Sequence, residues 1–165
     1  MSVRPLRLYL ETTVFNYYFD AERDGHDDVV RLFEAIGEGR YKGYASTYVT
    51  DELKRAPEPK RSNMLALTDK YGITVLDTKP SVVYLSRLYL DNGVIPSTHI
   101  LDSTHVALAA VYELDLVVSY NFKHINRDKT RRLTGVINRQ QGYEAIVICT
   151  AKEVMSNDRA HRGYS

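Results

Sequence analysis

Short apolar runs alternate with amphipathic stretches along most of the chain, and this alternation is the main structural signal in the sequence. The runs are bounded by turn residues, which is typical of strands buried on both faces of a parallel sheet. Strands are predicted at residues 6–11, 41–47, 73–77, 115–121 and 144–150. Helices are predicted at 27–36, 49–56, 60–72 and 80–93, within 95–114, and at 151–155. Because such strands pair in parallel through right-handed crossovers, the sequence predicts an α/β fold, a three-layer α/β/α sandwich with a mainly parallel five-stranded sheet.

The helix within 95–114 stands out because its middle, which includes the run Val106–Tyr112, is apolar on every side. A helix of this kind must be covered all round, so we expect it at the centre of the fold. The run is far shorter than the roughly 20 residues needed to span a bilayer, so no membrane association is expected. The length of 165 residues suits one domain, predicted at 1–155 and followed by a frayed polar tail at 156–165.

Polar residues occur where several of these elements meet. Glu11 ends the first strand, Glu52 lies in the first turns of the helix after the second strand, and Asn121 ends the fourth strand. Asp102 immediately precedes the apolar part of the central helix. Ligands of parallel sheets bind beyond the carboxyl ends of the strands, so we expect these four side chains to share one pocket. Taken singly, each acid has an ordinary alternative, as a helix cap, a first-turn acid or the partner of a neighbouring base.

Clustered carboxylates favour a cation, and hard oxygen ligands suit Mg²⁺ or Mn²⁺. Such ions activate water and stabilise the charge that develops on a phosphate. His105 and His124 each lie three residues after a predicted site residue, and each either faces the pocket or is a core residue. Neither has the spacing of a zinc ligand, so the sequence argues against a zinc site. His99 has no predicted role.

Basic residues concentrate near the C-terminus, where residues 121–165 carry nine Lys and Arg against four Asp and Glu, although the net charge is only +1. Lys123, Arg127 and Lys129 begin beside Asn121, and if they flank the acidic pocket they suit a polyanionic substrate, whose phosphates they would bind. The alternative is an ordinary solvated surface. Ser119 is expected to contact the pocket. Thr12, like the threonine after it, either binds a phosphate or a metal-bound water, or caps the following helix.

Four motifs, in order, carry a resemblance to a known family: YLETTVF, TDEL, DSTHVALAA and LVVSYNFKHI. With their separations they resemble the PIN-domain nucleases, and most closely the VapC-type toxins. The resemblance covers nearly the whole chain. It implies an α/β/α sandwich, metal-dependent cleavage of RNA phosphodiester bonds, a homodimer, and a cognate antitoxin that blocks the acidic pocket.

The resemblance assigns the catalytic and metal-binding positions to Glu11, Glu52, Asp102 and Asn121. Two of them depart from the commoner pattern, in which the first acid is aspartate and the fourth position is often aspartate as well. We therefore predict an Mg²⁺- or Mn²⁺-dependent endoribonuclease, in the role of a toxin of a toxin–antitoxin pair. The alternative prediction is a catalytically weakened PIN-fold module that binds RNA or a protein partner.

Other classes fit the sequence less well. A phosphorelay receiver needs paired acids after the first strand, and these are missing after Glu11. Neither a G-x-G-x-x-G motif nor a P-loop is present, which argues against a nucleotide cofactor. The single cysteine, Cys149, is predicted to be a buried thiol. With no predicted secretory signal, it favours a cytoplasmic location.

Overall fold

The computed structural model describes residues 4–162, including the side chains up to Asp158. Its strands are β1 (Leu6–Leu10), β2 (Tyr41–Ser46), β3 (Thr74–Leu76), β4 (Leu116–Val118) and β5 (Val147–Cys149). Its helices are α1 (Thr12–Tyr18), α2 (His26–Gly37), α3 (Thr47–Leu53), α4 (Lys60–Lys70), α5 (Pro80–Asp91), α6 (Ile100–Val111), α7 (Asp128–Gln140) and α8 (Ala151–Arg162).

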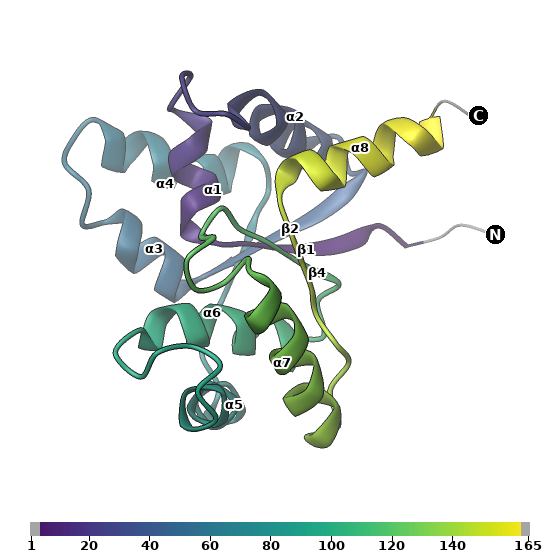
Figure 1. Ribbon diagram of the computed structural model, residues 1–165. Coiled ribbons are helices and arrows are strands. Elements are labelled where there is room, and N and C mark those ends of the chain that lie inside the picture. Colours follow the sequence, from purple (N-terminus) through teal and green to yellow (C-terminus); the bar gives the residue numbers. More distant parts are fainter. Residues whose placement is uncertain (1–3, 163–165) are drawn as a thin grey trace.

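The strands form one parallel sheet in the order β3-β2-β1-β4-β5. Helices α1, α2 and α8 cover one face and α5, α6 and α7 cover the other (Figure 1). The predicted α/β/α sandwich with a five-stranded parallel sheet is therefore confirmed. Within the described residues, no helix is both long and apolar enough to cross a membrane.

The chain reverses its direction of travel across the sheet at β1. It first moves outward through β2 and β3, then returns over the sheet through α5 and α6 to pair β4 with the other side of β1. The crevice beyond the carboxyl ends of β1 and β4 is the switch point at which open parallel sheets bind ligands. Residues that follow these two strands are therefore placed in the position most suited to a site.

Helix α6 is buried as its sequence predicts, since every residue from Ser103 to Ala110 is buried. Small polar side chains let it pack closely against α5. Ser103 Oγ donates to Ser86 O at 2.8 Å, and Ser86 Oγ donates to Ser103 Oγ at 3.0 Å. These bonds satisfy buried hydroxyl groups that would otherwise destabilise the interface. Close packing against α5 holds α6 in place, and with it the side chains of its first turns.

Three helices differ from the prediction, and the first is α1, which the predicted helices did not include. Helix α7 was not predicted, because its stretch was interpreted only as a basic surface run, although the helix is amphipathic and buries Ile137 beside polar residues such as Thr130, Thr134 and Asn138. Helix α8 was predicted to end at residue 155, but it continues to Arg162. Its side chain Asp158 accepts from Arg40 Nη1 at 2.5 Å and from Tyr41 Oη at 3.0 Å. The polar tail predicted from residue 156 is thus helical as far as it is described, whereas residues 163–165 lie outside the described part.

Candidate functional site

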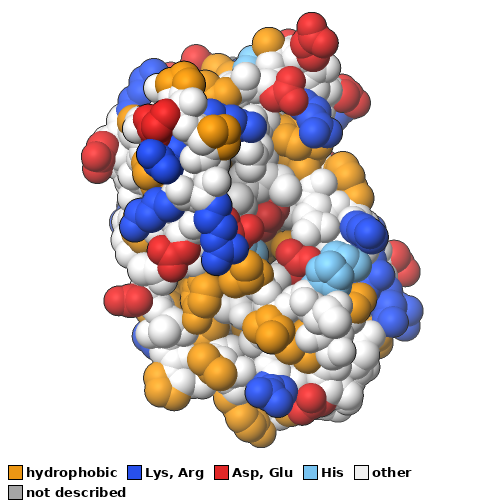
Figure 2. Space-filling model, turned by 90° about the vertical axis from the view of Figure 1, so that its left-hand side faces the viewer, with side chains coloured by type: hydrophobic (Ala, Val, Ile, Leu, Met, Phe, Trp, Pro, Cys, Tyr) orange, Lys and Arg blue, Asp and Glu red, His pale blue; other side chains and the backbone are white. Residues whose placement is uncertain are grey.

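The candidate site lies beyond the carboxyl ends of β1 and β4, where the first turns of α6 and the C-terminal part of α3 approach. Figure 2 views this side of the molecule: carboxylates and histidine lie close together near the middle of the face, with Lys and Arg on both flanks. Asp102 lies in the first turn of α6, just before the apolar part of that helix. Glu11 is the residue between β1 and α1.

Glu11 is only 3% exposed and is held by two hydroxyl groups. Thr13 Oγ1 and Ser119 Oγ donate to its Oε1 at 2.6 and 2.7 Å. Burial raises the pKa of the Glu11 carboxyl, and the charge of His105 and these donors oppose that shift. Because both hydroxyls reach the same oxygen, they orient the carboxylate and leave Oε2 outside this pair of bonds.

Glu52 is linked to a buried histidine that the sequence left unassigned between pocket and core. His105 Nε2 lies 2.7 Å from Glu52 Oε1, and its other ring nitrogen, Nδ1, lies 2.6 Å from Tyr9 Oη. Tyr9 Oη is in turn 2.8 Å from Ser46 Oγ. His105 is both a core residue and a site residue, and Tyr9 and Ser46 are members that sequence reasoning missed. The only sequence signal for Tyr9 is its position two residues before Glu11, on the same face of the strand.

The electrostatics of this pair favour its ionised form. Burial acts to raise the pKa of Glu52, but the hydrogen bond and charge of His105 outweigh it, and the pKa of Glu52 falls below its ordinary value. Burial acts to lower the pKa of His105, yet the bond to Glu52 and the charge of Glu11 raise it overall. A buried charge with a hydrogen-bonded partner of opposite sign is the arrangement that such a site requires.

Asp102 and Asn121 are brought together as expected for a shared pocket. Asn121 Nδ2 donates to Asp102 Oδ1 at 3.1 Å, and Asn121 Oδ1 accepts from the backbone N–H of His124 at 3.0 Å. The amide therefore orients Asp102 and anchors the loop after β4. These contacts suit a residue that positions a ligand, and the bond from His124 uses one of the two acceptor sites of the carbonyl oxygen.

His99 and His124 approach the same carboxylate. His99 Nδ1 lies 3.7 Å from Asp102 Oδ2, and the two imidazole rings are 4.0 Å apart, centre to centre. The sequence argued against a zinc site because His105 and His124 lack zinc-ligand spacing, and it gave His99 no role. The folded chain overturns that argument, since ligand atoms of His99, His124 and Asp102 all lie within 4.8 Å of one another.

The three carboxylates are chemically suited to a hard cation, but their oxygen atoms do not lie close together. In the described part of the chain, Glu11, Glu52 and Asp102 do not form a group whose ligand atoms all lie within 4.8 Å. Mg²⁺ keeps several waters and needs only one or two direct carboxylates, so the oxygen donors suit it without a three-carboxylate cage. Direct contact with all three would require their side chains to move inward.

The predicted substrate-binding residues divide into two groups. Thr12 Oγ1 donates to Glu52 Oε1 at 2.9 Å, so it positions a carboxylate, and α1 has no side-chain cap. Arg127 donates to Val94 O at 2.8 Å and to Thr130 Oγ1 at 3.0 Å, which ties α7 to the fold. Lys123 and Lys129 are exposed and have the freedom to meet a phosphate.

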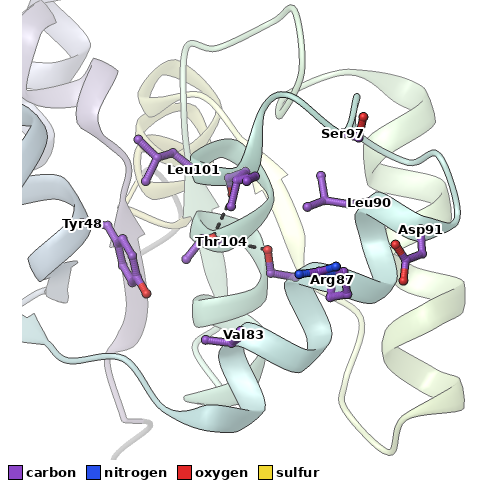
Figure 3. A pocket seen from close by; sticks show the side chains of 10 residues that line it. Tyr48, Val83, Arg87, Leu90, Asp91, Ser97, Leu101 and Thr104 are labelled. Carbon is purple, nitrogen blue, oxygen red and sulfur yellow. Dashed lines mark hydrogen bonds between the residues drawn. The ribbon is translucent and has the colours of Figure 1, made fainter.

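A separate groove of about 400 Å³ lies between α5 and α6, with Tyr48 of α3 on its other side (Figure 3). Leu90 and Leu101 line it, while Val83 and Ile100 at its rim are more than half exposed. None of the four predicted catalytic residues lines this groove. It is an apolar surface next to the polar site rather than part of it.

Comparison with known structures identifies the fold. VapC20 of Mycobacterium tuberculosis, a toxin that cleaves the sarcin–ricin loop, superposes with a TM-score of 0.55 over 71% of this chain and 92% of its own, at 13% identity. The chain has a VapC-type PIN-domain fold. VapBC2 of Rickettsia felis bound to promoter DNA gives a TM-score of 0.58 at 12% identity, covering 87% of this chain and 97% of that one.

DNA-bound VapBC of Salmonella typhimurium matches this VapC-type fold with a TM-score of 0.54 at 17% identity, over 88% of this chain and 98% of that one. No protein-family model matches the sequence, and neither does the sequence of any curated protein. The similarity thus resides in the three-dimensional arrangement. The PIN fold suggested by the four sequence motifs is confirmed at this level.

Proposed function

We propose that the chain is a metal-dependent endoribonuclease that uses Mg²⁺ or Mn²⁺ to hydrolyse RNA phosphodiester bonds. The observation that carries the proposal is the gathering of Glu11, Glu52 and Asp102 around the switch point of a VapC-type fold, each held by side-chain hydrogen bonds. One solved protein of this fold is named as a toxin that cleaves the sarcin–ricin loop. The sequence prediction and the geometry support the same activity.

In this proposal Glu11, Glu52 and Asp102 hold the cation, with Asn121 orienting Asp102. When bound, the cation supplies Lewis-acid stabilisation of the phosphate and a more acidic water. Thr13 and Ser119 keep the buried Glu11 carboxylate in place, and His105 with Thr12 does the same for Glu52. Such fixed orientation matters because misplacement of a catalytic group by about 1 Å can cost 100-fold in rate.

The positive flanks would bind the RNA backbone. Lys123 and Lys129 are exposed near the loop after β4, and Arg55 is close enough to Glu52 to lower the pKa of that carboxyl, although burial and His105 weigh more heavily. Contacts of this kind fix the register of a strand without reading its bases. The choice of RNA target would therefore depend on residues other than these basic side chains.

A toxin role would add a protein partner. The Rickettsia and Salmonella structures with this fold are VapBC complexes bound to DNA, which supports a cognate antitoxin for this chain as well. The apolar groove between α5 and α6 offers a surface for that partner or for a second copy of the chain. The proposed cytoplasmic location follows from the same role.

The alternative function is a PIN-fold module that binds RNA or a partner with little turnover. It is favoured by the spacing of the three carboxylates and by the Asn121 carbonyl, which accepts from a backbone N–H. In that case RNA binding would persist when divalent cations are chelated.

Cleavage of end-labelled RNA by the purified chain decides between these functions. We would compare Mg²⁺, Mn²⁺ and EDTA for the wild type, for Asp102→Asn and for Asp51→Asn, which is a matched control because Asp51 is an exposed carboxylate beside Glu52. We expect metal-dependent cleavage that is lost only in Asp102→Asn, with both variants folded by circular dichroism. Full activity of Asp102→Asn would reject the assignment, and RNA binding without cleavage in any metal would favour the module.

A further inference from the structure

A second set of metal-ligand side chains lies beside the proposed Mg²⁺ site. His99 is the residue before α6, Asp102 lies in the first turn of α6, and His124 lies in the loop after β4. One ligand atom of each side chain lies within 4.8 Å of a ligand atom of the other two. Among the described residues, this is the one group of three or more His, Cys, Asp or Glu side chains that meets this distance. Two imidazoles and a carboxylate make up a donor set different from the all-oxygen set of the catalytic carboxylates.

His124 lacks the partners that a buried imidazole needs. It is 8% exposed, and neither Nδ1 nor Nε2 has a hydrogen-bond partner among the described residues. Leaving a buried polar group unpaired destabilises the folded chain. Its backbone N–H is bonded to Asn121 Oδ1, so the loop holds the residue in place. A ring that is fixed, buried and unpartnered is short of an interaction that a bound cation would supply.

The geometry is close to what a tetrahedral ion requires. Bonds of about 2.0–2.1 Å from Zn²⁺ to its ligands place neighbouring ligand atoms about 3.4 Å apart. His99 Nδ1 and Asp102 Oδ2 are already 3.7 Å apart. The His99 side chain is 44% exposed, so it can rotate toward the ion and leaves a route for entry from solvent. A water would fill the fourth position, as in zinc sites with three protein ligands.

We propose that His99, Asp102 and His124 bind a divalent transition-metal ion of the Zn²⁺ class at a site that adjoins the proposed Mg²⁺ site and shares Asp102 with it. Imidazole ligands select zinc, cobalt, nickel and copper over Mg²⁺, which prefers oxygen. Binding does not depend on the chain being a nuclease. Its consequence, which does rest on the proposed function, is that the ion competes for Asp102 and lowers Mg²⁺-driven cleavage.

Titration of the metal-free full chain with Co²⁺ tests the site, because inner-sphere Co²⁺ in a tetrahedral site absorbs visible light. The titration is done in excess Mg²⁺ and repeated with Zn²⁺ by calorimetry, for the wild type, His99→Ala, His124→Ala and His26→Ala. His26 is a control histidine whose Nδ1 is bonded to Tyr17 O, away from the cluster. Because the His99 side chain is exposed, His99→Ala is expected to fold normally. It therefore still tests the site if His124→Ala folds poorly.

We expect one equivalent of Co²⁺ per chain with a tetrahedral spectrum, unchanged in His26→Ala and at least tenfold weaker in His99→Ala and His124→Ala. Absence of a spectrum in the wild type, or equal affinity in wild type and His99→Ala, would overturn the proposal. For the consequence, Zn²⁺ should inhibit Mg²⁺-driven cleavage by the wild type more strongly than it inhibits His99→Ala, each relative to its own rate. The binding result stands whether or not the chain cleaves RNA, so the two proposals fail separately.

Discussion

Two histidine–carboxylate clusters meet at the first turns of α6, and they differ in how their polar atoms are satisfied. In the inner cluster, both ring nitrogens of His105 have partners, Glu52 and Tyr9. In the outer cluster, the His124 ring lies nearer the surface than that of His105, yet both of its ring nitrogens are buried and have no partner among the described residues. The hydrogen-bonding groups of the inner cluster are thus satisfied by the folded chain itself. In our proposal, a bound metal ion satisfies those of the outer cluster.

The comparison is tested most strongly by His105→Ala. Removing this fully buried ring leaves a cavity and deletes its hydrogen bonds to Glu52 and Tyr9, which together cost about 3 kcal/mol. We expect that loss in the free energy of unfolding measured with urea. His105→Gln, whose amide can still donate to Glu52, should recover part of it. A loss below about 1 kcal/mol would show that the inner network is not a structural unit.

Glu52→Gln separates positioning from catalysis in the inner cluster. The amide keeps the size and a hydrogen-bonding oxygen but removes the charge that the proposed cation needs. We expect cleavage of end-labelled RNA to fall by about 100-fold or more, which corresponds to about 2.7 kcal/mol of transition-state stabilisation. Asp51→Asn should retain wild-type cleavage, and equal rates for wild type and Glu52→Gln would remove Glu52 from the catalytic set.

His124→Ala probes the outer cluster in the absence of transition metal. Removing the wild-type ring deletes packing and also relieves the cost of its unpaired nitrogens, so we expect a net loss of no more than about 1 kcal/mol in urea unfolding. With Zn²⁺ added, the wild type should gain stability by mass action and the variant should not. A metal-free loss as large as that of His105→Ala would contradict the distinction between the clusters.

Ser119→Ala should give the smallest change. It removes one of two hydroxyls that donate to Glu11 Oε1, and we expect a loss of about 1 kcal/mol in the free energy of unfolding. Ser156→Ala, an exposed serine on α8, is the control and should unfold like the wild type. An identical midpoint for both variants would show that Thr13 alone suffices to hold Glu11.

The position of the candidate acids could be predicted from the chain because strand burial and helix period are local properties. Neighbouring residues are enough to predict the apolar run that ends at Glu11 and the apolar helix that carries Asp102. A parallel sheet then places the carboxyl ends of its strands at one edge. Helix α7 was missed although its sequence is amphipathic, because its charged face drew attention as a basic run and much of its buried face is polar, at Thr130, Thr134 and Asn138. Asn138, for example, accepts a hydrogen bond from Tyr89, a partner far away in the sequence.

By itself, the sequence determined the sandwich, the parallel sheet and the edge at which Glu11, Glu52, Asp102 and Asn121 gather. Only the tertiary structure decided what those side chains touch: that Tyr9 and His105 brace Glu52, that Asn121 orients Asp102, and that His99 meets His124. The physical reason is the distance along the sequence over which each kind of interaction acts. Period and burial act over a few neighbouring residues, whereas hydrogen-bond partners and metal ligands are set by distances of a few ångströms between residues up to about a hundred positions apart.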